Sequence, residues 1–177
     1  TPRMPRTGKA FSVRMSNAGP LGWVSDVRGY RYQPGHPETG RPWPAMPPTA
    51  LEAWAALAGC PAEPEACLIN LYAPGTRMGL HQDRDEAEYS APVLSLSLGA
   101  AALFRYGGLR RSDPTRSIRL SSGDALVIGG ASRLIFHGID RLYPAGDLLA
   151  EEILPGVLPS DGRCNLTLRR VTACGTP

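Results

Sequence analysis

The sequence has no long apolar run. None of its stretches approaches the roughly 20 consecutive apolar residues that a membrane-spanning helix needs. Its start also lacks the order of basic, apolar and small residues that marks a secretory signal peptide. We therefore expect a cytoplasmic protein that does not enter a membrane. The chain of 177 residues begins at Thr1 without an initiator Met, so the sequence leaves open whether a leader has been removed.

Cysteine is also scarce, and its spacing is irregular. The four cysteines form no C-x-x-C pair, the element on which most structural zinc sites are built: Cys60, Cys67, Cys164 and Cys174. Reduced thiols of a cytosolic protein are therefore the better interpretation, with a zinc site as the alternative.

Helical patterns are few, whereas turn residues are abundant. The chain contains 20 glycines and 18 prolines, which is typical of a turn-rich β protein. We expect one helix, because Thr49 and Glu52 match a capping box and Gly59 is placed to end it. The other segments alternate apolar and polar residues over short lengths, which predicts strands. These lie at 11–15, 21–27, 67–72, 78–83, 92–98, 103–106, 117–120, 125–128, 133–139 and 163–171.

We expect the first two of these strands to form a hairpin around the turn at 17–20, and residues 144–162 to form a loop. Many short strands after one helix predict a jelly-roll sandwich. Such a roll has an open mouth between its sheets, which is a natural ligand pocket.

Charge is unevenly distributed, although the net charge is only +3. Residues 1–41 carry seven basic and two acidic side chains, whereas residues 42–177 carry twelve and fourteen. Aromatic residues and arginines alternate within 23–32, and stacking plus phosphate neutralisation is how single-stranded nucleic acid is held. The segment predicts a polyanionic partner. The alternatives are a solvated basic tail and aromatic side chains that simply pack.

One stretch contains a His-x-Asp pair. His81 and Asp83 are two residues apart on an expected strand, so their side chains point to the same side. A pair of this kind with one distant histidine makes the facial triad of non-haem Fe(II) oxygenases. Of the other two histidines, His36 lies among prolines and glycine, which leaves His137 as the third ligand. The alternative is that these histidines are packed or surface residues that bind backbone groups.

The last expected strand has one polar and one apolar face. Strand alternation places these residues on its polar face: Arg163, Asn165, Thr167 and Arg169. Two arginines inside a roll are costly unless each meets an anion. A guanidinium is the natural bidentate partner of a carboxylate, so this face predicts a site for a small dicarboxylate. The alternative is that the face meets solvent, where the same pattern is common.

Together these motifs resemble the AlkB family, and its bacterial members most closely. The resemblance covers about residues 13–170 in the same order and rests on Asn70-x-Tyr72-x-Pro74-Gly75, His81-x-Asp83, His137 and Arg163-x-Asn165-x-Thr167-x-Arg169. Family members are Fe(II)- and 2-oxoglutarate-dependent dioxygenases that repair alkylated nucleic acid bases. The sequence departs from the bacterial pattern at three positions between the functional ones, where packing and lesion preference are affected more than chemistry: Leu71, Arg84 and Cys164.

The resemblance implies a mainly β protein with a flanking helix. Its core would be a double-stranded β-helix, the jelly roll, under an N-terminal nucleotide-recognition lid. One dioxygenase domain would occupy residues 1–177, with the lid at roughly 11–45 and the catalytic core at 66–171.

The resemblance also implies residues for the metal and the co-substrate 2-oxoglutarate. Fe(II) would be held by His81, Asp83 and His137. The carboxylate of 2-oxoglutarate far from the metal would be held by Asn70, Tyr72 and Arg163. The carboxylate beside the keto group would be held by Arg169 with Asn165.

For the substrate, the resemblance implies that Trp23 stacks on a flipped base, that His81 lies on the other side of this base and that Asp85 contacts its edge. Further nucleic acid contacts would be made by Met15, Tyr30 and Arg111. The implied reaction is oxidative demethylation of bases of the 1-methyladenine and 3-methylcytosine type. 2-Oxoglutarate and O₂ become succinate and CO₂, and formaldehyde leaves. The implied partner is alkylated single- or double-stranded DNA, with RNA as a further substrate, and the implied oligomeric state is a monomer.

Two rival functions use parts of the same pattern. A 2-oxoglutarate hydroxylase of proteins or small molecules would keep the metal site, but it has no need of Trp23 beside arginines. A metal-free nucleic-acid-binding β domain would leave His81, Asp83 and the two inner arginines without a shared purpose.

Overall fold

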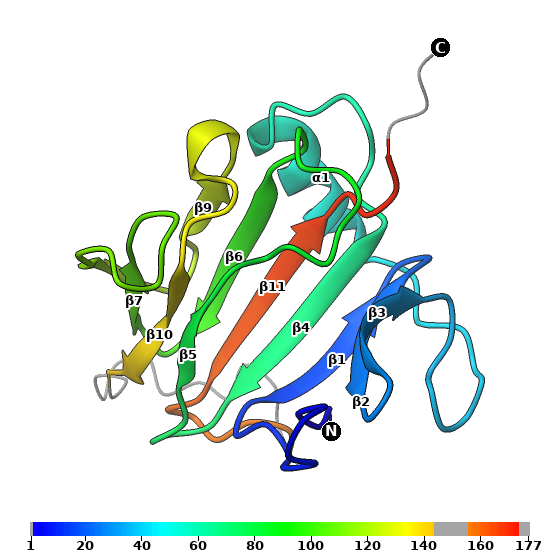
Figure 1. Cartoon of the computed structure of the whole chain (residues 1–177), viewed down its shortest axis with the longest axis horizontal. Coiled ribbons are helices and arrows are strands. Elements are labelled where there is room, and N and C mark those ends of the chain that lie inside the picture. The colour runs from blue at the N-terminus through cyan, green and yellow to red at the C-terminus, as the bar shows by residue number, and fades with distance from the viewer. Residues whose placement is uncertain (1, 144–155, 174–177) are drawn as a thin grey trace.

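The computed structural model describes residues 2–143 and 156–173 (Figure 1). These residues form a mainly β structure with one α-helix and one short 3-10 helix. The elements in chain order are β1 (Arg14–Ala18), β2 (Gly22–Asp26), β3 (Gly29–Gln33), α1 (Pro48–Leu57), β4 (Ala66–Tyr72), β5 (Met78–His81), β6 (Val93–Gly99), β7 (Ala102–Tyr106), β8 (Arg116–Leu120), β9 (Ala125–Ile128), η1 (Gly130–Ser132), β10 (His137–Leu142) and β11 (Arg163–Arg169).

The strands form two larger sheets and one hairpin. The larger sheets have the orders β1-β4-β11-β6-β9 and β5-β10-β7-β8, and β2 pairs with β3. The pairings are antiparallel. Apolar side chains of both sheets, among them Tyr72, Phe104 and Ile139, share one core cluster. The predicted jelly roll is therefore confirmed, with β11 in the middle of the larger sheet (Figure 1).

Helix α1 covers the face of the five-stranded sheet that is turned away from the second sheet. Trp54 of the helix is buried in a cluster with Leu94 of β6 and Leu168 of β11. Because the even-numbered residues of β11 pack against the helix, its odd-numbered residues must point between the two sheets. This packing decides the side of the sheet on which the polar face of β11 lies.

The capping-box prediction for this helix is wrong. The N-cap is Pro47, no side chain caps the helix, and Pro48 occupies its first position. Proline is well suited there, because the N–H that it lacks would have no partner within the helix. The predicted end is confirmed: the helix stops at Leu57, and Gly59 follows with φ +62°, a left-handed conformation that favours glycine.

The predicted hairpin of the first two strands is also wrong. β1 pairs with β4, whereas β2 pairs with β3, so the segment after Ala18 leaves the large sheet. The side chain of Asn17 stabilises this departure. Its Nδ2 donates to the carbonyl of Trp23, and its Oδ1 accepts from the N–H of Trp23, both at 3.0 Å.

Several other boundaries differ from the prediction: β1 covers 14–18 rather than 11–15, and β5 ends at His81, so Asp83 lies beyond the strand rather than on it. The strand expected at 133–139 begins only at His137, because the 3-10 helix η1 and its continuation occupy the preceding residues. The loop expected at 144–162 is described from residue 156 onward, and 144–155 lie outside the described residues. Within the described ranges, no helix is long and apolar enough to cross a membrane.

Three cysteines have free thiols in the described structure. Cys67 and Cys164 are buried, and Cys60 is half-buried. Burial raises the pKa of the Cys67 thiol to about 12, so this thiol stays protonated near neutral pH.

Candidate active site

The three predicted metal ligands meet at one point between the sheets. The possible ligand atoms of His81, Asp83 and His137 all lie within 4.8 Å of one another. His81 ends β5 and His137 begins β10, and the two residues are register partners on adjacent strands. Their imidazole rings are 4.6 Å apart between centroids. The carboxylate of Asp83 lies 3.6 Å from Nε2 of His81 and 3.7 Å from Nε2 of His137.

Backbone carbonyls determine which ring nitrogen of each histidine is free. Nδ1 of His81 lies 2.9 Å from the carbonyl of Gly79, and Nδ1 of His137 lies 3.1 Å from that of Ile135. Because a carbonyl can only accept, each Nδ1 carries the proton and each Nε2 keeps its lone pair. Both Nε2 atoms face Asp83, which is the arrangement that a divalent metal needs.

The environment also favours the metal-binding protonation states of His137 and Asp83. Burial and the neighbouring His81 lower the pKa of His137 below its usual value, although Asp83 opposes this shift, so His137 is neutral near pH 7. Burial opposes ionisation of Asp83, but neighbouring cations, Arg169 foremost, outweigh it and hold the pKa of Asp83 below the usual range. Two imidazoles and one carboxylate form the donor set of a non-haem Fe(II) site.

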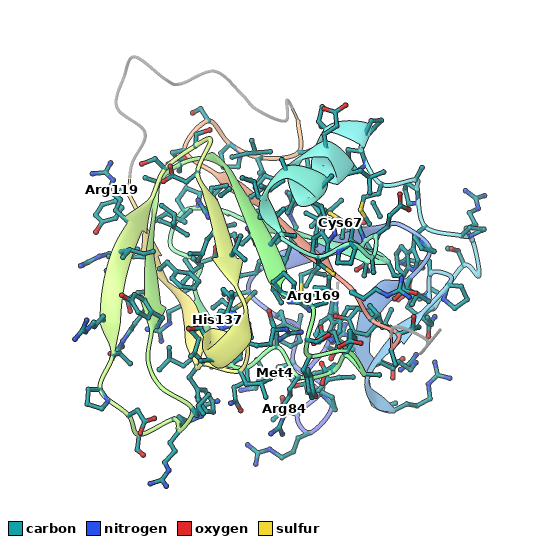
Figure 2. All side chains as sticks on the ribbon, turned by 90° about the horizontal axis from the view of Figure 1, so that it is seen from above. Met4, Cys67, Arg84, Arg119, His137 and Arg169 are labelled. Carbon is teal, nitrogen blue, oxygen red and sulfur yellow. The ribbon has the colours of Figure 1, made fainter. Side chains whose placement is uncertain are left out.

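A hollow of about 520 Å³ adjoins the ligands, and the polar face of β11 forms one of its walls. Its polar lining contains Thr167 and the side chains predicted for the co-substrate: Asn70, Tyr72, Arg163, Asn165 and Arg169. Figure 2 shows His137 and Arg169 near each other in the interior, with Cys67 on the side of the helix. The prediction that the polar face of β11 points into the roll is therefore correct, and the alternative that this face meets solvent is wrong.

Several buried polar atoms in this hollow lack a partner among the described residues. They are Asn70 Oδ1, Arg163 Nε and Arg169 Nε. The two arginines are almost fully buried, at 1% and 6% exposure. An unpaired buried donor costs about 1–3 kcal/mol, and more when it is charged. Two unpaired cationic donors in one hollow fit a dianionic ligand, and 2-oxoglutarate is such a ligand.

The two arginines differ in their existing partners. Arg169 donates to Asp83 Oδ1 at 2.8 Å and therefore contacts a metal ligand directly. Arg163 donates to the hydroxyl of Ser97 at 2.8 Å, and no carboxylate of the described chain forms an ion pair with it. Burial lowers the pKa of Arg163 below its usual value, whereas Asp83, Tyr32 and Glu86 outweigh burial at Arg169 and raise its pKa.

The predicted base-contacting residues meet at the edge of the β2–β3 hairpin. Nε1 of Trp23 donates to Asp85 Oδ2 at 2.8 Å, so the hairpin contacts the segment that follows the metal ligands. The ring of Trp23 is stacked on Tyr30, with 5.4 Å between centroids and 19° between planes. Half of the Tyr30 surface is exposed. The structure thus brings Trp23, Tyr30 and Asp85 together.

Met15 and Arg111 occupy different places. Met15 lines a second hollow of about 800 Å³ together with Trp23, Asn17 and Arg28. Arg111 lies on the loop between β7 and β8, with its guanidinium 5.0 Å from the ring centroid of Phe136, the residue before His137. Met15 therefore lines the same hollow as Trp23, whereas Arg111 is an exposed residue that contacts Phe136 and is not part of the hollow at the metal ligands.

Sequence reasoning missed five residues of the site. Ser95 and Ser97 hold Asn165 and Arg163, and the other three surround Arg169 and Asp83: Tyr32, Glu86 and Arg133. The serines share the alternation of β6, which could have indicated their direction. The other three come from separate loops and strands, and no local pattern connects them.

Comparisons with known proteins agree with this geometry. Residues 1–169 match the model of the 2OG-Fe(II) oxygenase superfamily. The chain is 56% identical over 163 residues to an alpha-ketoglutarate-dependent dioxygenase AlkB homolog of Caulobacter vibrioides, covering 92% of this chain and 70% of that protein. It is 49% identical over 139 residues to AlkB of Escherichia coli K12, covering 76% and 64%. The solved structure of OsALKBH1 superposes with a TM-score of 0.71 at 34% identity, covering 90% and 79%.

A jelly roll with two histidines and one aspartate beside a dicarboxylate site defines the class of 2-oxoglutarate- and Fe(II)-dependent dioxygenases, and this protein is one of them. Within that superfamily, the chain belongs to the AlkB family. Its cofactor is Fe(II), and its co-substrate is 2-oxoglutarate.

Gly138 allows β5 and β10 to approach closely at the metal site. A Cβ at this position would lie 2.5 Å from the carbonyl oxygen of Met78 and 2.9 Å from the carbonyl carbon of Gly79, both backbone atoms of β5. Gly138→Ala should therefore push β5 and His81 away from His137. We expect metal affinity to fall roughly 10-fold or more, as when an outer-shell partner is lost.

Titration of the metal-free protein with Mn(II) or Co(II) would measure this effect. Gly79→Ala is the matched control, because nothing lies within 4 Å of a Cβ on the neighbouring strand there. Equal metal affinities of the two variants would contradict the conclusion that the close approach of β5 and β10 at Gly138 keeps the metal ligands in place.

Proposed function

We propose that the protein repairs nucleic acids by oxidatively demethylating N-alkylated bases of the 1-methyladenine and 3-methylcytosine type. The observation that carries this proposal is the Trp23–Asp85 hydrogen bond, which joins an aromatic, basic hairpin to the segment of the metal ligands. DNA, single- or double-stranded, is the proposed substrate, with RNA as a further one. A monomeric state and a cytoplasmic location stay predictions from the sequence.

We assign the metal to three side chains. His81 and His137 would bind it through their free Nε2 atoms and Asp83 through its carboxylate. When bound, iron and 2-oxoglutarate would activate O₂: one oxygen atom would enter succinate as CO₂ leaves, and the other would hydroxylate the N-methyl carbon, which would then leave as formaldehyde. The protein positions the reactants and excludes water.

The co-substrate would be held at both ends by the polar face of β11 and its neighbours. Arg163, with Asn70 and Tyr72, would bind the carboxylate far from the metal. Arg169, with Asn165, would bind the carboxylate near it. The unpaired Nε atoms of Arg163 and Arg169 support this assignment. The bidentate geometry of guanidinium and carboxylate would fix the orientation of the chain between them.

The substrate base would be held by the hairpin. Trp23 would stack on the extruded base, with His81 on its other side, and Asp85 would accept a hydrogen bond from its edge. Met15, Tyr30 and Arg111 would contact the flanking nucleic acid. Extruding a base costs a few kcal/mol, and the cost is least for a base that cannot pair. A methyl group on the Watson–Crick edge prevents pairing, so the lesion itself favours extrusion.

The test is loss of the methyl group from a defined oligonucleotide. Protein loaded anaerobically with Fe(II) and 2-oxoglutarate is mixed with an oligonucleotide that contains 1-methyladenine or 3-methylcytosine. Air is then admitted, and the mass of the oligonucleotide is followed. The proposal expects the methyl mass to disappear. An unchanged oligonucleotide beside continued succinate formation would instead favour a hydroxylase of another substrate class.

Trp23→Ala tests the stacking role separately. Base–aromatic stacking is worth about 1–3 kcal/mol per base, so the affinity for a methylated oligonucleotide should fall by that amount. Affinity for Mn(II) without nucleic acid should not change, because Trp23 is not a metal ligand, and this provides the internal control. Fluorescence anisotropy of a labelled oligonucleotide measures the first quantity and calorimetry the second. Unchanged anisotropy would exclude Trp23 as a base platform.

A further inference from the structure

Tyr32 connects the β2–β3 hairpin to the arginine beside the metal ligands. Its hydroxyl accepts a hydrogen bond from Nη1 of Arg169 at 2.8 Å and donates one to Oε1 of Glu86 at 2.5 Å. β3 carries Tyr32, whereas Arg169 ends the central strand β11 of the large sheet, 137 residues further along the chain. One phenolic hydroxyl thus joins the proposed lid to the proposed co-substrate site.

The groups around this hydroxyl form a closed network. Glu86 accepts from Arg169 at 3.2 Å and, through its other oxygen, from Arg133 at 3.1 Å. Arg133 also donates to the backbone carbonyl of Asp83 at 2.7 Å. The side chains of these charged residues are at most 7% exposed. Two carboxylates and two guanidiniums thus share one buried network, in which Nε of Arg169 stays without a partner among the described residues.

This network determines the orientation of Arg169. Nη1 is held by Tyr32 and Glu86, and Nη2 is held by Asp83. Nε is the nitrogen that lacks a partner among the described residues, and its direction depends on the other two being held. Burial raises the pKa of Tyr32 well above its usual value, so the hydroxyl keeps its proton and its donor role toward Glu86.

We propose that Tyr32 is a positioning residue that couples the packing of the β2–β3 hairpin against Arg169 and Glu86 to the binding of 2-oxoglutarate. The inference rests on the proposed function, because it uses the assignment of Arg169 to the co-substrate and of the hairpin to nucleic acid. With the hairpin seated, Tyr32 holds Arg169 in the orientation that the co-substrate carboxylate requires. Coupling between two ligands is reciprocal, so nucleic acid that seats the hairpin tightens 2-oxoglutarate binding, and 2-oxoglutarate tightens nucleic acid binding by the same factor.

The test is Tyr32→Phe, which removes the hydroxyl and keeps the ring. The dissociation constant of 2-oxoglutarate is measured by calorimetry on the Mn(II)-loaded protein, with and without a methylated oligonucleotide. The native protein should bind 2-oxoglutarate several-fold more tightly when the oligonucleotide is present. The variant should bind it about 10-fold more weakly than the native protein and show no gain from the oligonucleotide.

Hydrogen exchange provides a second readout that does not depend on turnover. In the native protein, 2-oxoglutarate should slow exchange of the amides of β2 and β3, and in Tyr32→Phe this protection should be lost while that of β4 and β11 stays. Tyr143→Phe is the matched control. Its ring packs against the guanidiniums of Arg119 and Arg141, away from this network, and it should behave like the native protein.

Three results would overturn the coupling. The variant could bind 2-oxoglutarate as tightly as the native protein, or the oligonucleotide could still tighten its 2-oxoglutarate binding. The third result is weaker 2-oxoglutarate binding while the amide protection of β2 and β3 stays as in the native protein. Failure of the proposed function is a different result, in which the native protein itself leaves the methylated base intact.

Discussion

His81→Ala should abolish metal binding and turnover while leaving the fold intact. The side chain supplies one of three ligands, and loss of an outer-shell partner alone costs 10–100-fold, so we expect a loss of at least about 100-fold. The side chain of His81 is 36% exposed and contacts a backbone carbonyl and the other site residues. Its removal therefore leaves no cavity in the main core. Metal titration and succinate formation are the measurements.

His36→Ala is the matched control for this prediction. His36 is the histidine outside the metal cluster, and its ring meets the edge of Trp43 at 5.5 Å between centroids. The control should keep both metal affinity and turnover. Turnover of His81→Ala at a native rate would mean that the metal is bound elsewhere.

Replacement by methionine should affect protein stability at one of the two buried arginines and co-substrate binding at the other. Arg169→Met leaves Asp83 and Glu86 buried without their shared cation. Breaking a buried ion pair in this way costs about 3–5 kcal/mol. We therefore expect Tm to fall by roughly 6–20 °C, since 1 kcal/mol corresponds to about 2–4 °C in a protein of this size.

Arg163→Met should instead leave the stability of the ligand-free protein unchanged within about 1 kcal/mol, because no carboxylate in the described structure pairs with Arg163 and the buried charge disappears. Its effect should fall on the co-substrate: binding of 2-oxoglutarate should lose about 2–5 kcal/mol, the usual cost of truncating one partner of a buried charge pair. Thermal scans and calorimetry separate the two variants. A large destabilisation by Arg163→Met would contradict the view that the ionic partner of this side chain is the bound co-substrate.

Much of this site could be predicted from local patterns. β11 alternates strictly and His81 ends β5, so strand geometry places the side chains of both, whereas Asp83 lies two residues beyond the end of β5 and is placed by the segment that follows. Helix α1 then decides the direction of the polar face of β11 because it covers Leu168 and its neighbours. The strand segments that carry these residues lie close to their predicted positions.

Other features depend on long-range packing and could not be predicted in this way. β1 pairs with β4 rather than with β2, because the polar side chain of Asn17 binds the backbone of Trp23 and redirects the chain. The network around Tyr32 and Glu86 joins four distant segments, and each residue alone has an ordinary local context. Its members satisfy one another only once the fold has brought them together.

The most direct test of the whole account is the ratio of formaldehyde released to succinate formed on an oligonucleotide with a single 1-methyladenine. Oxidation of the N-methyl group at the site of His81, Asp83 and His137 predicts about one formaldehyde per succinate, because one 2-oxoglutarate is consumed for each methyl group removed. An unmethylated oligonucleotide of the same sequence should release no formaldehyde. Succinate formation without formaldehyde on the methylated strand would contradict the account.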